Sequence, residues 1–196
     1  SYGQLGYGNT TQVGTTNTPA DVGDIVLGGE ATALSLGTYH TCALLTTGNV
    51  VCWGYGNYGS LGYGDTNNQG DGENPSFEGA VAVGAPVTAL SCNEYNTCVV
   101  LEDGDVLCWG QNSYGELGQA NSEQIGDDEE PDSIDPIVLG DTAESLAVGA
   151  NHVCALTSSD NLRCWGWGAY GMLGYGNTNT IGDDENPSVA GPVELL

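Results

Sequence analysis

The sequence predicts an all-β protein in which short antiparallel strands return every 56 residues. Three observations support this fold class. A tandem repeat runs through the chain without insertions, 32 of the 196 residues are glycine, and no stretch shows the 3.6-residue periodicity of an amphipathic helix. Glycine weakens helices but suits turns, so this composition favours a strand-rich, turn-rich chain.

The repeat is defined by aromatic motifs that return at a fixed interval. Tyr-Gly and Cys-Trp-Gly both show it, through Tyr2, Tyr58, Tyr114 and Tyr170, and through Trp53, Trp109 and Trp165. Counting by this interval gives repeat units 1–57, 58–113 and 114–169 and a partial unit 170–196. Together they form one segment of about three and a half repeats.

The sequence pattern predicts four short strands in each unit, and the second unit is an example. A glycine-rich loop at 58–75 precedes expected strands at 80–83, 87–92, 97–101 and 105–109, and a further strand is expected at 192–195. Four short strands in a unit of this length are typical of a β-propeller blade. Continuous apolar runs such as residues 42–45 indicate strands buried on both faces, as in blades that stack side by side.

Six of the seven cysteines form pairs ten residues apart across the last hairpin of each unit: Cys42/Cys52, Cys98/Cys108 and Cys154/Cys164. A three-residue turn ending at Gly48 pairs Leu45 with Asn49 and places Cys42 opposite Cys52. A Cα separation of about 4.5 Å at such a non-hydrogen-bonded position suits a disulfide. We expect three disulfides and an oxidising compartment rather than metal sites, because CxxC spacing is missing and histidines are few.

The seventh cysteine, Cys92, stands where the neighbouring units have Leu36 and Val148. We interpret it as a small buried hydrophobic residue. A free or intermolecular thiol is the alternative.

The motifs around the hairpins resemble regulator-of-chromosome-condensation repeats. The resemblance rests on residues 37–44, Gly48, 52–54 and 58–62, and the third unit repeats the first part at 149–156. The second unit departs from it, with Asn93 and Asn96 in place of glycine and histidine. Such families form seven-bladed propellers, so the resemblance implies that this chain is half of one, with interactions through loops on one face. The paired cysteines resemble secreted and surface repeats of bacteria.

The charge balance excludes several classes of partner. The chain has 26 acidic residues against one base, Arg163, for a net charge of −25. We therefore expect no nucleic-acid binding, which needs cationic side chains, and no direct membrane insertion, since no apolar run has the length of a span. The chain starts at Ser1 without a leader, and we interpret it as a mature or trimmed segment.

Acidic loops are the candidate metal sites. They comprise Asp71 and Glu73, then Asp127, Asp128 and Glu129, then Asp183, Asp184 and Glu185. Clustered carboxylates in a turn suit Ca²⁺, which takes six to eight oxygen ligands. The alternative is a solvated acidic turn that satisfies its own backbone amides.

Loop aromatics are the candidate partner-binding residues. Trp167 breaks the tryptophan period, with Tyr55 and Gln111 at its equivalent positions, and it is a candidate together with Tyr55. Tyr7, Tyr63 and Tyr175 occupy a second repeated loop position. Rigid aromatic side chains on loops favour partner contacts. His40 and His152 are interpreted as structural. Phosphate-binding and nucleophile-elbow motifs are missing from the sequence, and we expect no enzyme.

The leading hypothesis is a non-enzymatic extracellular module for protein–protein interaction, on a bacterial surface or in the extracellular matrix. One alternative is a structural subunit of a homo-oligomer or filament, in which open sheet edges let two copies complete a seven-bladed ring. A second alternative, implied by the resemblance, is a secreted inhibitor of a hydrolase. The partner is expected to be a protein or a second copy.

Overall fold

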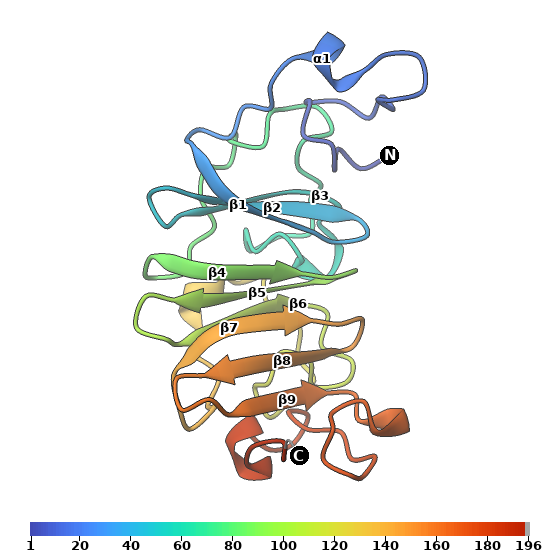
Figure 1. Cartoon of the computed structure of the whole chain (residues 1–196). Helices are drawn as coiled ribbons and strands as arrows, with labels where there is room; N and C mark the ends of the chain where they lie inside the picture. The colour runs from blue at the N-terminus through green and yellow to red at the C-terminus, as the bar shows by residue number, and fades with distance from the viewer. Residues whose placement is uncertain (195–196) are drawn as a thin grey trace.

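Three three-stranded antiparallel sheets stack side by side in the computed structural model, which describes residues 1–194 (Figure 1). The first sheet contains β1 (Ala31–Leu36), β2 (His40–Leu45) and β3 (Val50–Gly54). The second contains β4 (Val87–Cys92), β5 (Asn96–Leu101) and β6 (Val106–Gly110), and the third β7 (Ala143–Val148), β8 (His152–Thr157) and β9 (Leu162–Gly166). These blades confirm the all-β prediction.

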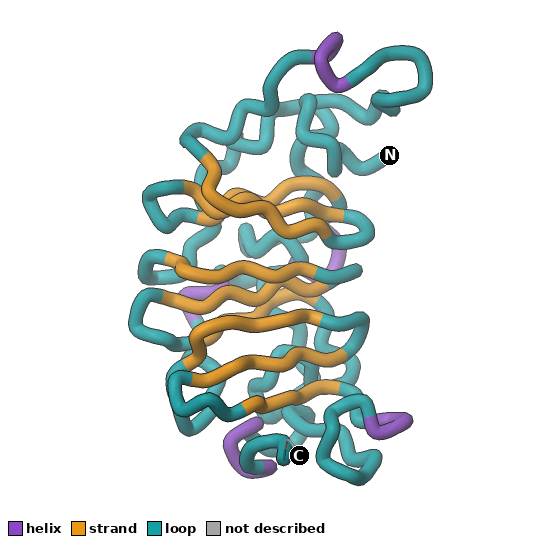
Figure 2. Tube along the Cα trace, in the orientation of Figure 1, coloured by secondary structure: helices purple, strands orange, loops and turns teal. Residues whose placement is uncertain are grey.

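Helical structure is limited to single turns in the connecting loops. These are the α-helical turn α1 (Pro19–Val22) and the 3₁₀ turns Asn57–Gly59, Pro131–Ser133, Ala169–Gly171 and Pro187–Ala190. Long loops behind the strands link each sheet to the next (Figure 2). In the part of the chain that the structure describes, no helix has the length and apolar character of a membrane span.

The hairpins adopt the predicted register. Leu45 N–H donates to Asn49 O at 2.8 Å, and the turn closes with a left-handed residue, Gly48, at φ 82°. Gly104 and Asp160 take the same position at φ 88° and 59°. Each cysteine pair lies directly opposite in the ladder, with Cα atoms 4.1 Å apart, and all three disulfides are formed.

The expected fourth strand of each blade is reduced to one backbone contact. Residues 80–83 run beside β3 but form no strand, and only Val81 N–H bonds to it, at Val50 O (2.8 Å). Ile137 and Val193 make the same contact with Val106 and Leu162. Gly84 in the left-handed region and Pro86 without an N–H end the extended segment early. The segment predicted at 192–195 makes this contact at Val193, and residue 195 lies outside the described residues.

The core lies between the sheets. All six residues of β2 and of β5 are buried, as the continuous apolar runs predict. Each Cys-Trp-Gly tryptophan donates its indole N–H to a carbonyl in the loop that precedes its own sheet, at Gln4, Ser60 and Glu116, over 3.0–3.1 Å. Hydrogen bonds therefore accompany apolar packing at each blade contact.

The two end sheets expose residues that are covered between sheets. Leu36 is 72% exposed, whereas its counterpart one period on, Cys92, is 8% exposed. At the other end Leu156 is 39% exposed and its counterpart Leu44 only 7%. Two copies would supply six blades rather than the expected seven, because each copy contains three sheets. Val193 also already occupies the outer edge of β9 that Ile25 of a second copy would need.

Candidate functional site

Eight aromatic side chains line one edge of the stacked sheets. We call them the aromatic belt: Tyr2, Tyr39, Tyr55, Tyr58, Tyr95, Tyr114, Trp167 and Tyr170. Five tyrosines form a continuous series with ring centroids 4.5–6.1 Å apart, and the other three residues form a second series at 5.2 and 5.9 Å. These distances are typical of interacting aromatic rings.

The strand ends position the belt. Tyr39 lies in the turn that leads into β2, and Tyr55 follows β3, so the two meet at one edge, where Tyr55 N–H donates to Tyr39 O at 2.9 Å. Trp167 N–H donates to Asn151 O in the third sheet at 2.8 Å. This edge lies on the side toward which the arrows of β4 and β7 point in Figure 1.

Two belt residues have unusual backbone conformations. Tyr58 and Tyr170 lie in the left-handed region at φ 60°, within their 3₁₀ turns. A non-glycine residue rarely adopts this conformation, and such positions occur often at functional sites. Tyr170 is 90% exposed and is the most accessible aromatic ring of the belt.

The acidic loops lie directly beside the belt. A Cβ on Gly3, which follows Tyr2, would be 2.4 Å from Asp71 N, and one on Gly59 would be 2.4 Å from Asp127 N. Gly115 and Asp183 repeat this approach. Glycine is required at these three turns because no side chain fits between the loops. The edge therefore combines aromatic rings with carboxylates.

Two of the three acidic loops bring their carboxylates together. The oxygens of Asp127, Asp128 and Glu129 lie within 4.8 Å of one another, as do those of Asp183, Asp184 and Glu185. Burial, together with the neighbouring aspartates, raises the pKa of Glu129 and of Glu185 to about 7. These two clusters have the oxygen donors that a Ca²⁺ ion prefers, and water or backbone oxygens would have to complete its coordination.

The first acidic loop is closed by its own hydrogen bonds. Glu73 Oε1 accepts the N–H of Gly70 at 2.6 Å, and Asn68 donates to Asp71 at 3.4 Å. The carboxylates of Asp71 and Glu73 thus stabilise the turn, and Gly72 stands where the other two loops have a third acidic residue.

Among the predicted binding aromatics, Tyr55 and Trp167 lie in the belt, whereas Tyr7, Tyr63 and Tyr175 do not. The Tyr63 hydroxyl accepts Cys52 N–H at 3.1 Å and donates to Gly79 O at 3.2 Å, and burial raises its pKa to about 12. Tyr175 makes the equivalent bonds to Cys164 and Gly191. These hydroxyls attach the outer segment to its sheet. Tyr7 faces the apolar pocket beside Leu34 and Leu36.

Sequence reasoning missed six belt residues: Tyr2, Tyr39, Tyr58, Tyr95, Tyr114 and Tyr170. Four of them belong to the Tyr-Gly motif that defines the repeat. The Tyr-Gly motif is visible in the sequence, but there it only defines the repeat and does not show that its rings meet those of other units.

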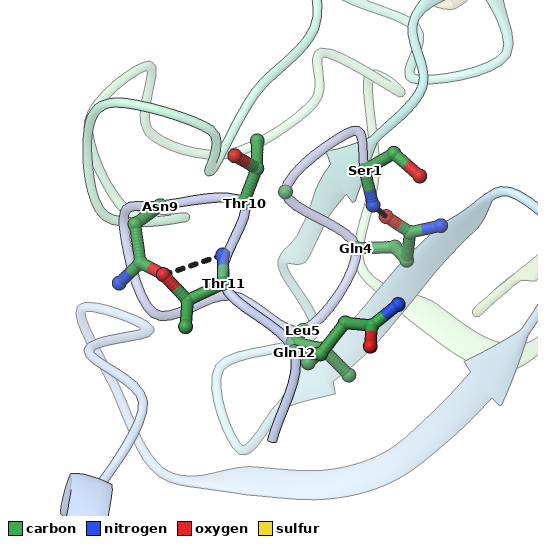
Figure 3. Close-up of a pocket in the computed structure, with 8 residues that line it drawn as sticks. Ser1, Gln4, Leu5, Asn9, Thr10, Thr11 and Gln12 are labelled. Atoms are coloured by element: carbon green, nitrogen blue, oxygen red, sulfur yellow. Dashed lines mark hydrogen bonds between the residues drawn. The ribbon is translucent and has the colours of Figure 1, made fainter. Parts of the chain in front are cut away.

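A polar pocket of about 290 Å³ lies in the N-terminal loop (Figure 3). Its polar groups bond to one another: Ser1 N donates to Gln4 Oε1 at 3.2 Å, and Thr11 N–H to Asn9 Oδ1 at 2.9 Å. No acidic, histidine or cysteine side chain lines it in the described chain. It offers little chemistry, and the belt remains the better candidate.

Family models match this chain in each sheet. The regulator of chromosome condensation (RCC1) repeat matches residues 31–60, 87–116 and 144–171 in one model and 103–156 in another. The chain is 30% identical to the ultraviolet-B receptor UVR8 of Arabidopsis thaliana over 148 residues, 74% of this chain and 31% of the receptor. It is also 30% identical to the human E3 ubiquitin-protein ligase HERC2 over 143 residues, 72% of this chain and 3% of the ligase.

Solved structures share the fold. Human WBSCR16 aligns with a TM-score of 0.71 at 19% identity, over 95% of this chain and 44% of that chain. Yeast RCC1 (Prp20), in a complex with Kap60, aligns with a TM-score of 0.71 at 15% identity, over 100% of this chain and 43% of that chain. The chain thus spans less than half the length of these similar proteins.

Proposed function

Because this chain belongs to the RCC1 repeat family, we propose that it is a non-enzymatic module that binds a basic protein through its aromatic belt. The single observation that carries the proposal is the position of the belt beside the acidic loops at one edge of the sheets. Yeast RCC1, a relative with the same fold, forms a complex with a protein, Kap60, which is a precedent for a protein partner.

The charge of the chain favours a basic partner. A net charge of −25 attracts cationic proteins over long range and speeds their association. At close range, lysine and arginine side chains stack on tyrosine and tryptophan faces, at about 0.5–1 kcal/mol for each exposed contact. A partner rich in lysine or arginine could use the rings and the neighbouring carboxylates together.

Three disulfides support an extracellular setting, since such bonds persist in oxidising compartments. Within this proposal the module acts on a bacterial surface or in the extracellular matrix, a setting favoured by the similarity of its paired cysteines to bacterial secreted repeats. Inhibition of a secreted hydrolase would be one form of such binding.

The proposal can be tested with an arginine-rich peptide as the probe. Trp53, Trp109 and Trp165 are at most 2% exposed, so Trp167 should dominate changes in fluorescence on binding. We expect Tyr170→Ala to weaken binding by about two- to fivefold, which corresponds to one lost cation–π contact.

The matched control is Phe77→Ala. Phe77 is 71% exposed and uncharged like Tyr170, but it lies outside the belt. Both variants keep the net charge, so any general attraction between the acidic chain and the peptide is unchanged. If Tyr170→Ala and Phe77→Ala bind the peptide equally, the belt is not the binding face.

A further inference from the structure

A buried cluster of thiol and imidazole groups lies between the first and second sheets. It contains His40 and Cys42 from β2 and Cys92 from β4, whose potential ligand atoms all lie within 4.8 Å of one another. His40 is 1% exposed, Cys42 is 0% and Cys92 is 8%. The function proposed above does not use this cluster.

One point in the cluster is close to all three donors. The hydroxyl oxygen of Thr97, on β5, lies 2.9 Å from His40 Nε2 and 3.8 and 3.7 Å from the sulfur atoms of Cys42 and Cys92. The three side chains therefore converge from two blades, and a small displacement of Thr97 would leave a common centre between them.

The cluster is specific to this blade contact. At the contact between the second and third sheets, Asn96 stands in place of His40 and Val148 in place of Cys92, although the disulfide Cys98–Cys108 is retained. Packing does not require a thiol here, since leucine and valine occupy the equivalent positions elsewhere in the chain. The combination of histidine and unpaired cysteine at one contact thus needs another explanation.

We propose that, when the Cys42–Cys52 disulfide is reduced, His40, Cys42, Cys52 and Cys92 bind one Zn²⁺ ion. Three sulfur donors and one imidazole nitrogen form a common structural zinc site, with Zn–S bonds of about 2.3 Å. The ligands of such a tetrahedral site are about 3.8 Å apart. The donor atoms of His40, Cys42 and Cys92, now within 4.8 Å of one another, can reach this spacing by small movements. The fourth donor, Cys52, is held beside the cluster by its bond to Cys42.

The protonation states suit this ligand set. Burial lowers the pKa of His40 to about 4, partly offset by the backbone of Glu94, so the imidazole is neutral and can donate a lone pair. Its Nδ1 atom is buried and makes no hydrogen bond of normal geometry to any described residue. Burial raises the pKa of Cys92 to about 11, so Zn²⁺ must displace the proton of this thiol.

An external phosphine is the reductant for the Cys42–Cys52 disulfide. The phosphine attacks the disulfide and water then supplies an oxygen atom, so the products are two thiols and a phosphine oxide. Binding of Zn²⁺ releases three protons, one each from Cys42, Cys52 and Cys92, and none from the neutral histidine. Exchange with a small-molecule disulfide such as oxidised glutathione re-forms the Cys42–Cys52 bond, releases two glutathione thiols and removes two ligands. The disulfide and the metal site therefore exclude each other.

The test compares the whole chain with Cys92→Val, the residue found at Val148. Both proteins are reduced with phosphine in urea and then diluted, without oxygen, into buffer that contains Zn²⁺ or Co²⁺. Bonds between Co²⁺ and thiolates absorb light strongly, so Co²⁺ reports binding directly. The reduced wild type should bind one ion per chain, with a higher melting temperature. Loss of a residue that only orients a metal ligand weakens metal binding about 10–100-fold. Cys92→Val removes a ligand itself, so we expect it to bind Zn²⁺ at least about 100-fold more weakly.

A matched control removes a different cysteine pair. Cys98→Ala with Cys108→Ala leaves all four proposed ligands and should bind Zn²⁺ as the reduced wild type does. His40→Asn, which copies Asn96, should lose affinity. Equal affinity of the wild type and Cys92→Val, or no cobalt–thiolate absorption in the wild type, would overturn the proposal, whether or not the metal-free reduced chain folds.

Discussion

At the scale of single residues, three tryptophans each join a sheet to the loop that precedes it. Trp109 is fully buried, and its indole N–H donates to Ser60 O at 3.1 Å. The ring contributes apolar packing, and its N–H is one of two donors to Ser60 O, the other being the Thr97 hydroxyl at 3.0 Å. Both contributions depend on one side chain, so these tryptophans should be sensitive positions.

Trp109→Phe tests the hydrogen bond. The substitution removes one of the two donors to Ser60 O and leaves a small gap beside the ring, and we expect it to lower the free energy of unfolding by about 1–2 kcal/mol. Urea denaturation followed by circular dichroism measures the change. Trp167→Phe, in the exposed belt, should stay within about 0.5 kcal/mol of the wild type. Equal effects would mean that the hydrogen bond contributes little.

The sequence predicted some residue roles better than others. Cysteine pairing followed from the count of residues around Gly48, because ladder geometry is local. The roles of Tyr63 and Tyr55 did not follow, since both are loop tyrosines in sequence. One bonds to a strand 11 residues away and the other meets Tyr2 across 53 residues. Only the packing of loops from different units separates them.

At the scale of elements, each blade is a hairpin crosslinked by a disulfide with an acidic loop attached. The crosslinks join directly paired residues near the middle of each hairpin. They constrain the unfolded chain in addition to the contacts of the folded one.

Removal of one crosslink should cost stability without changing the fold. For Cys98→Ala with Cys108→Ala, the loop of about ten residues predicts a loss of about 2–3 kcal/mol in the free energy of unfolding. Thermal and urea denaturation of the variant and the oxidised wild type measure it. An unchanged stability would show that the register is maintained by packing alone.

The acidic loops predict a pH dependence. The pKa of Glu129 and of Glu185 rises from an ordinary value of 4.5 to about 7 on folding. Between these values the folded chain holds protons that the unfolded chain has lost, so this contribution to stability is lost as the pH rises through 7. Glu129→Gln with Glu185→Gln should reduce the fall in melting temperature between pH 5 and pH 8. Glu123→Gln with Glu144→Gln makes the same charge change at exposed sites and should leave the fall in melting temperature unchanged.

The same clusters are the expected Ca²⁺ sites. At pH 8, added Ca²⁺ should raise the melting temperature because it relieves repulsion between the three carboxylates of each cluster. A chelator should reverse the increase, and Asp127→Asn with Asp183→Asn should abolish it. Asp71→Asn lies in the loop that closes on itself and should leave the response intact. An identical melt with Ca²⁺ and with chelator would exclude these sites.

The number of strands per blade shows what local sequence patterns can predict. The three inner strands were expected close to their observed positions, since turns and apolar runs define them. The expected outer strand at 80–83 forms a single contact, because its pairing depends on a partner about 30 residues earlier and on Gly84 and Pro86 at its end.

At the scale of the whole molecule, the stack of sheets has two apolar ends. Leu34 and Leu36 are 61% and 72% exposed beside a pocket of about 370 Å³. Exposed apolar patches of this kind favour association. We expect light scattering to show mass increasing with concentration, and Leu34→Ser with Leu36→Ser to reduce it. Val138→Ser, 51% exposed in an outer loop, is the control. A concentration-independent monomer would contradict this expectation.

Each sheet receives its outer contact from the next repeat unit, as Val81 does for β3 and Ile137 for β6. The unit that was duplicated in the gene therefore need not coincide with the unit that folds. A recombination event that deletes one period still leaves each surviving sheet followed by a segment that can supply its outer contact, wherever the crossover falls. Arrays of this kind can shorten or lengthen by whole periods while each remaining blade keeps its register.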